Sequence, residues 1–259
     1  MALTNKTIAS TYGDILQADN SGSGRTANGT TIKDGLGQST ALTLGGDKVK
    51  ITPSSDSTTA LTVETAGGTD LLVVDTSNSA VKVGSTQSYA NTQIQRFTCH
   101  DLQPTAGTHH SMFVDGAWAA GFTALTFGTG TDPATTYSLG TSEANASALT
   151  LSIWYIPAAI TIDEVRVIAA GESAATVNFH LFSYTMATGT GSGAGDLSSG
   201  AVVASTGSTL TTDNDRVTTT TLTIDSANVA ADKVVVATVE NVGATTDLTA
   251  QLIVKYHFQ

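Results

Sequence analysis

Residues 60–84 form the stretch that most constrains how this chain of 259 residues can fold. Runs with strand-like alternation or continuous apolar character lie at 61–64, 71–74 and 81–83, with turn clusters at 67–68 and 76–79. Period-two alternation bounded by Gly, Asn and Ser is typical of strands joined by turns. A module of about 25 residues buries too little apolar surface to offset its chain entropy. Its apolar faces therefore need partners, and other copies of the chain are the simplest source, so we expect an intertwined oligomer.

The same stretch resembles the shaft modules of bacteriophage fibre and related virion proteins. The resemblance rests on the pattern A-L-x-V-x-x-x-x-G-x-x-L-L-x-V-D-T-x-N-x-x-V-x-V-G, which begins at Ala60. Residues 3–17 and 31–37 look like the amino-terminal part of such phage structural proteins. The resemblance covers roughly the first third of the chain. It implies a virion component, assembled in the host cytoplasm, and a homotrimer, because these proteins are commonly homotrimers.

Residues 1–39 are expected to form an extended arm, because their apolar residues are too sparse for an independent core. Following the resemblance, we expect this arm to anchor the protein on a capsid or tail partner. A flexible terminus is the alternative. The anchoring side chains would be Tyr12, Ile15, Leu16 and Ile32.

Residues 40–89 are expected to form a slender β stem. Residues 40–44 and 48–51 alternate around Gly45-Gly46-Asp47, a sequence that suits a tight hairpin. Together with the runs of 60–84, these segments give about five strands, shared among the copies of an intertwined stem.

Residues 90–259 are expected to form an antiparallel, jelly-roll-like β-sandwich head. Strand patterns recur at short, even spacing, which is typical of such sandwiches, and no long helix is expected. Four consecutive threonines have high β propensity but little apolar surface, which favours an edge or intersubunit strand. The expected strands include residues 149–156, 160–168, 175–182, 201–204, 217–224, 233–239 and 248–258. The whole chain is therefore assigned to the all-β class.

Charge and cysteine content exclude several classes of protein. The formal net charge is −11, and no Lys/Arg cluster is present, so we expect no nucleic-acid partner. No apolar stretch approaches the length needed to cross a bilayer, and residues 1–20 lack a signal-peptide pattern, so membrane insertion is not expected. Cys99 is the sole cysteine, which precludes an intrachain disulfide and fits assembly in a reducing cytoplasm.

The sequence contains no motif typical of catalysis or cofactor binding. Its glycine-rich stretches fit neither a nucleophile elbow nor a phosphate-binding loop. His100, Asp101, His109 and His110 are of metal-ligand type, but their spacing matches no zinc module. We therefore expect no enzyme activity, no metal site and no cofactor.

Three functions remain open. The first is a homotrimeric short fibre whose arm binds other virion proteins and whose head binds a glycan or protein of the host surface. The second is a capsid decoration or head-fibre protein, and the third is a monomeric carbohydrate-binding module. Aromatic and polar residues of the head would supply contacts with a receptor. The candidates are Trp118, Tyr137, Tyr155, His109 and His110.

Overall fold

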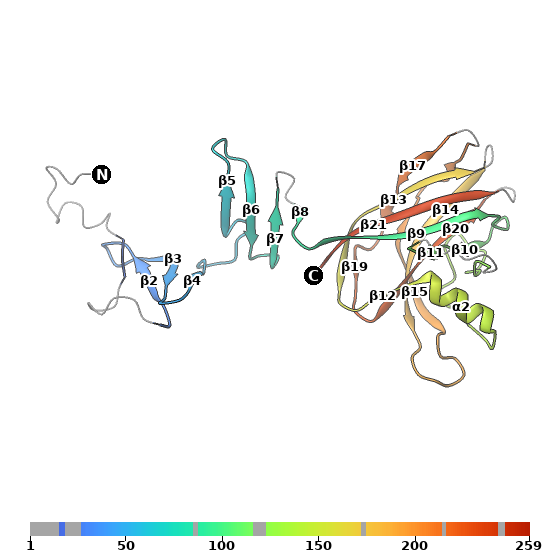
Figure 1. The fold of residues 1–259 in the computed structure, drawn as a ribbon, viewed down its shortest axis with the longest axis horizontal. Helices are drawn as coiled ribbons and strands as arrows, with labels where there is room; N and C mark the ends of the chain where they lie inside the picture. Colours follow the sequence, from blue (N-terminus) through green and yellow to red (C-terminus); the bar gives the residue numbers. More distant parts are fainter. Residues whose placement is uncertain are drawn as a thin grey trace. The chain divides into compact units, whose positions relative to one another are not determined.

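The chain divides into two units, Met1–Ala90 and Asn91–Gln259, each with its own internal contacts. Both are built mainly of antiparallel strands, which confirms the all-β class (Figure 1). The computed structural model describes residues 16–18, 27–84, 88–115, 123–171, 175–213, 216–242 and 247–259.

The first sheet of the amino-terminal unit has the order β1-β2-β3-β4. The hairpin expected around residues 45–47 is confirmed, because the Gly45 N–H donates to Lys48 O at 2.7 Å and Leu44 lies opposite Val49. The sheet crosses the boundary expected between residues 39 and 40, since β2 pairs with β3. Its strands are β1 (Gln17–Ala18), β2 (Thr30–Lys33), β3 (Ser39–Leu44) and β4 (Val49–Ile51).

The second sheet of this unit contains the three strands predicted within residues 60–84. Its order is β5-β6-β7-β8, with antiparallel pairing throughout. The strands are β5 (Leu61–Glu64), β6 (Asp70–Asp75), β7 (Ala80–Val83) and β8 (Ser88–Tyr89).

The buried Asp75 carboxylate holds the turn between β6 and β7. It accepts hydrogen bonds from Asn78 N at 3.0 Å, Asn78 Nδ2 at 2.9 Å and Lys82 Nζ at 3.0 Å. The bonds from the Asn78 and Lys82 side chains lower the pKa of Asp75 to about 2. The turn therefore keeps its ion pair far into the acid range.

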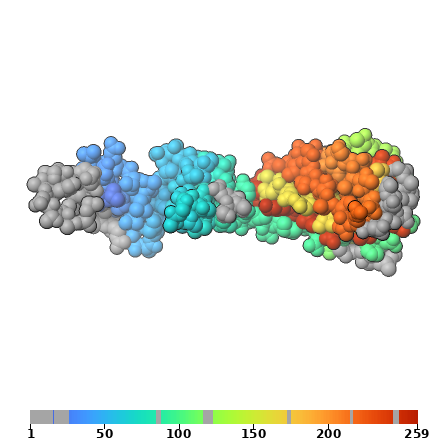
Figure 2. Space-filling model, turned by 90° about the horizontal axis from the view of Figure 1, so that it is seen from above, coloured from blue at the N-terminus to red at the C-terminus, as the bar shows by residue number. Residues whose placement is uncertain are grey.

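The carboxy-terminal unit is a sandwich of two antiparallel sheets, which confirms the predicted β-sandwich; the space-filling view shows one side of it (Figure 2). The six-stranded sheet has the order β11-β9-β21-β13-β17, with β19 also on β13. Its strands are β9 (Thr92–Leu102), β11 (Phe113–Val114), β13 (Ile160–Gly171), β17 (Thr218–Thr221), β19 (Asn228–Val229) and β21 (Leu248–Phe258).

The seven-stranded sheet has the order β10-β20-β14-β15-β18, with β12 also on β20 and β16 on β14. Its strands are β10 (His109–Ser111), β12 (Ile153–Ile156), β14 (Thr176–Met186), β15 (Leu197–Ser205), β16 (Leu210–Thr211), β18 (Thr223–Ile224) and β20 (Lys233–Asn241).

Alternate residues of both sheets face each other and form the main core. Phe179 and Leu181 of β14 and Leu252 and Val254 of β21 belong to one buried cluster and have no exposed surface. Burying such side chains stabilises the fold by about 1.5–3 kcal/mol each. Cys99 lies in this core, and burial raises the pKa of its thiol to about 12, so the thiolate is not formed at neutral pH.

A second apolar cluster covers the other face of the seven-stranded sheet. Phe182 and Tyr184 of β14 pack there with Phe127 and with Leu149 of α2 (Glu143–Ser152). Gly200 of β15 allows the close approach of the rings, because a Cβ at this position would lie 2.6 Å from Tyr184 Cε1. β20 is consequently buried on both faces.

The prediction of a strand over residues 149–156 was wrong in its first half. Residues 149–152 belong to the helix α2, and the strand β12 begins only at Ile153. Leu149 and Leu151 alternate with polar residues, but the preceding sequence favours a helix. The Ser142 hydroxyl caps it by accepting from Asn145 N at 3.3 Å, and Glu143 lies in the first turn. Local capping therefore outweighs the short alternation.

The four threonines of β17 occupy an edge of the six-stranded sheet, as predicted. Thr218 Oγ1 and Thr219 Oγ1 donate to Ala169 O at 3.0 Å and Val167 O at 2.9 Å on β13. These hydroxyls satisfy carbonyl groups of the neighbouring strand while leaving little apolar surface on the edge.

Candidate functional site

The predicted receptor residues His109 and His110 lie on β10 and are buried within the head. His109 has no exposed surface, and 8% of His110 is exposed. Antiparallel pairing with β20 places His109 opposite Glu240 and His110 opposite Val239. This pairing with a distant strand makes the segment part of the seven-stranded sheet.

His109, His180 and Asp132 lie in succession in the head. The Nε2 of His109 lies 2.9 Å from Gly130 O, and the ring centroid of His109 lies 5.0 Å from that of His180 on β14. His180 Nε2 lies 3.4 Å from an Asp132 carboxylate oxygen. The Nδ1 atoms of both histidines are buried without a hydrogen-bond partner in the described chain. Within that part of the chain, no group of three or more His, Cys, Asp or Glu residues could hold a metal ion.

Burial of His110 and His180 is expected to make the head sensitive to acid. Burial, with His109 nearby, lowers the pKa of His110 and of His180, although Asp132, Glu240 and Asp225 oppose the shift at His180. His110 Nε2 also accepts from Thr105 N at 3.1 Å, a bond that only an unprotonated nitrogen can accept. A histidine with a lowered pKa binds its proton more readily in the unfolded chain. The free energy of unfolding therefore falls as pH drops below about 6.5.

We expect the thermal midpoint of the head to fall between about pH 7.5 and 5.5, by about 2–4 °C for each kcal/mol lost. Circular dichroism at a series of pH values measures this slope. A variant carrying His110→Gln and His180→Gln should lose most of the pH dependence in this range. An equally steep slope in that variant would contradict the assignment to these histidines.

The two predicted tyrosines differ in exposure. Tyr137 stacks on Phe127, with centroids 4.9 Å apart, and exchanges backbone hydrogen bonds with Leu197. Tyr155 is 49% exposed, and its hydroxyl donates to the Asp232 carboxylate. That bond is the main cause of the raised pKa of Tyr155. Only Tyr155 of this pair offers a largely exposed ring, and Trp118 lies outside the described residues.

Of the predicted anchor residues, Tyr12 and Ile15 lie outside the described residues. Leu16 is 66% exposed, whereas Ile32 is 8% exposed within β2. The structure does not bring the four side chains into one described site, and the anchoring role stays a prediction.

One face of the sheet β5-β6-β7 consists of six apolar side chains. Strand register places Val74 between Leu61 and Val81, and Leu72 between Val63 and Val83. Val63, Val81 and Val83 are 47%, 43% and 42% exposed, although hydrophobic residues of this size are usually buried. We call these six residues the apolar stem face.

The sheet β2-β3-β4 has a smaller face of the same kind. Leu42 lies opposite Ile51 and Leu44 opposite Val49. Val49 is 66% exposed and Ile51 43%. Neither buried hydrophobic cluster of the described chain includes a residue of Met1–Ala90. Two successive sheets therefore expose apolar faces that this unit does not itself cover.

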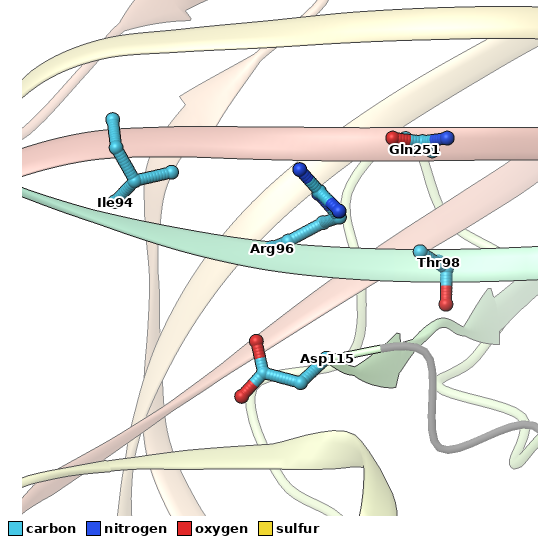
Figure 3. A pocket seen from close by; sticks show the side chains of 5 residues that line it. All are labelled: Ile94, Arg96, Thr98, Asp115 and Gln251. Carbon is cyan, nitrogen blue, oxygen red and sulfur yellow. The ribbon is translucent and has the colours of Figure 1, made fainter.

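A polar pocket of about 300 Å³ lies on the outer face of the six-stranded sheet. Figure 3 shows Ile94, Arg96 and Thr98 along β9, Gln251 on the neighbouring β21, and Asp115 on the other side of β9. Strand pairing explains the arrangement, since Thr98 lies opposite Gln251 and the Asp115 N–H donates to Arg96 O at 2.8 Å. None of these five residues was among the predicted receptor contacts.

Comparison with known proteins yields no family for this chain. No family model matches it, and no curated protein does. A solved structure described as "Structure of infectious bursal disease virus Gx strain" is similar at 9% identity with a TM-score of 0.25. The match covers 68% of this chain and 34% of that one, and a likeness this weak carries no argument about function. Among the described residues, no helix is both long and apolar enough to span a membrane.

Proposed function

We propose that this protein is the subunit of a homotrimeric virion fibre, in which the amino-terminal sheets of three chains cover one another. The observation that carries the proposal is the apolar stem face, together with the similar face on the preceding sheet. Contiguous apolar surface rimmed by polar residues is typical of an interaction site. The virion assignment and the trimeric state rest on the sequence resemblance to phage fibre shafts.

The partner that best matches the apolar stem face is another copy of the same chain. The face lacks charge, because the ion pair between Lys82 and Asp75 lies on the opposite side of the sheet. A wholly apolar face offers no charge pattern to a foreign partner, but it matches an identical face in chemistry. Covering the six side chains would contribute about 1.5–3 kcal/mol for each one fully buried. That gain supports association of a unit whose described residues belong to neither buried hydrophobic cluster.

The remaining parts take the roles that the resemblance implies. We propose that the amino-terminal arm docks on other virion proteins and that the sandwich head contacts the host surface. The proposal includes no catalytic activity and no resident cofactor. A capsid decoration protein with the same self-association is the second candidate, favoured by the same apolar faces. Location of the chain in an imaged particle would distinguish it from a tail fibre.

The mass of the full-length protein in solution tests the oligomer directly. Light scattering coupled to gel filtration at micromolar concentration should give about three times the chain mass of 26.3 kDa. The apolar faces would otherwise remain in water, which is the physical reason to expect association. A mass equal to one chain would refute the fibre proposal and would favour a monomeric binding module. A dimer would refute the threefold arrangement alone.

A further inference from the structure

We propose that the pocket between β9, β21 and Asp115 binds a sugar that carries one carboxylate, such as a hexuronic acid. This deepens the proposed function, because it gives the sandwich head a ligand class for attachment. The pocket lies wholly within Asn91–Gln259, so the inference depends on no contact between the two units.

Arg96 supplies the cation of the pocket. Its side chain projects from the outer face of β9, and in the described part of the chain no hydrogen bond or ion pair engages its guanidinium. Arg166 on β13 differs, because its guanidinium pairs with Glu164 at 2.8 Å. A planar guanidinium binds a carboxylate through two parallel hydrogen bonds, and no described residue occupies the donors of Arg96.

Asp115 supplies a fixed acceptor on the other side of β9. Its Oδ1 accepts from Gln95 Nε2 at 2.8 Å, and its backbone has a φ of 51°, a region that non-glycine residues rarely adopt. The hydrogen bond from Asp115 N to Arg96 O holds the residue in this conformation. The second carboxylate oxygen can accept from ligand hydroxyls, while Thr98 and Gln251 supply both donors and acceptors.

The charge balance selects the class of ligand. Among the five residues that line the pocket, Arg96 is the cation and Asp115 the anion, so a phosphate with two negative charges would be attracted by Arg96 and repelled by Asp115. A sugar acid has one carboxylate for Arg96 and several hydroxyls for Asp115, Thr98 and Gln251. The volume of about 300 Å³ is at the small end of ligand pockets, which suits a single sugar ring. Ile94, 59% exposed, can pack against the apolar C–H groups of that ring.

Titration calorimetry of the full-length protein with glucuronate, glucose and acetate tests the proposal. We expect glucuronate to bind with a dissociation constant on the order of 1 mM, as suits a small ligand with one charged contact. Glucose lacks the carboxylate and acetate lacks the ring, so each should bind at least about tenfold more weakly. Undetectable glucuronate binding at about 20 mM ligand, or equal binding of glucose, would overturn the proposal.

Two matched variants assign the roles of the residues. Arg96→Gln should weaken glucuronate binding about tenfold or more, whereas Arg166→Gln, on the same sheet but paired with Glu164, should not change it. Asp115→Asn keeps a residue type that tolerates positive φ and should reduce the preference for glucuronate over acetate. Unchanged binding in Arg96→Gln, or an equal loss in Arg166→Gln, would overturn the assignment. Because the mass is measured on the same samples, a monomer that binds glucuronate would refute the fibre while supporting the pocket.

Discussion

Replacing Val74 by aspartate is expected to convert the proposed trimer into single chains. Val74 lies at the centre of the apolar stem face, with Leu61 on one side and Val81 on the other. Association would bury a carboxylate without a partner, which costs several kcal/mol in each subunit. The three carboxylates would also repel one another. Light scattering at micromolar concentration should then give the mass of one chain.

Thr62→Asp provides the matched control for this experiment. Thr62 lies opposite Val73 and therefore faces the other side of the same sheet. Its replacement introduces the same charge and a similar loss of β propensity, but it leaves the apolar stem face unchanged. We expect the control to keep the mass of the wild-type protein. If both variants dissociate, the effect comes from disruption of the sheet; if neither does, the apolar stem face is not the interface.

Replacing Phe179 by alanine is expected to lower the free energy of unfolding of the head by about 3–5 kcal/mol. Phe179 has no exposed surface and lies in the cluster between the two sheets. Truncation leaves a cavity that the surrounding strands cannot fill, because the seven-stranded sheet is held by a second cluster on its other face. Unfolding in guanidinium chloride, followed by tryptophan fluorescence, measures the loss. Both tryptophans of the chain lie after residue 91, so this signal reports the head.

Val217→Ala is the control for the core variant. Val217 is 70% exposed and precedes the edge strand β17, so its truncation should change the free energy of unfolding by less than about 0.5 kcal/mol. Similar losses in the two variants would show that Phe179 does not support the core in the way its burial indicates.

The strands could be predicted from the sequence wherever residues close in the sequence determine the structure. β5, β6 and β7 are joined by short turns, so alternation and turn residues suffice to define them, and the edge position of Thr218–Thr221 follows from composition. Leu149 and Leu151 misled the prediction, because a short alternation looks the same in a helix end and in a strand. The hydroxyl cap at Ser142 was the signal that could have revealed α2.

The apolar stem face was predictable, but the pocket was not. The stem face comes from one continuous stretch of sequence, and the proposal that it needs a partner rests on its small size. The pocket instead depends on the pairing of Thr98 with Gln251 and on the placement of Asp115 beside Arg96. No local sequence pattern predicts such contacts between strands that are far apart in the chain. The burial of His109 is hidden for the same reason, because its partners are on β14 and β20 and at Gly130.

The central place of β21 has a consequence for synthesis on the ribosome. β21 lies between β9 and β13, two strands that are translated well before it. Until it emerges, β9 and β13 have no common neighbour, and the six-stranded sheet cannot close. The hairpins of Met1–Ala90, in contrast, pair strands that follow one another directly and can form while translation continues. Strand pairing in the stem is thus available early, although its apolar faces still await other copies, whereas the head can close only after β21 has emerged.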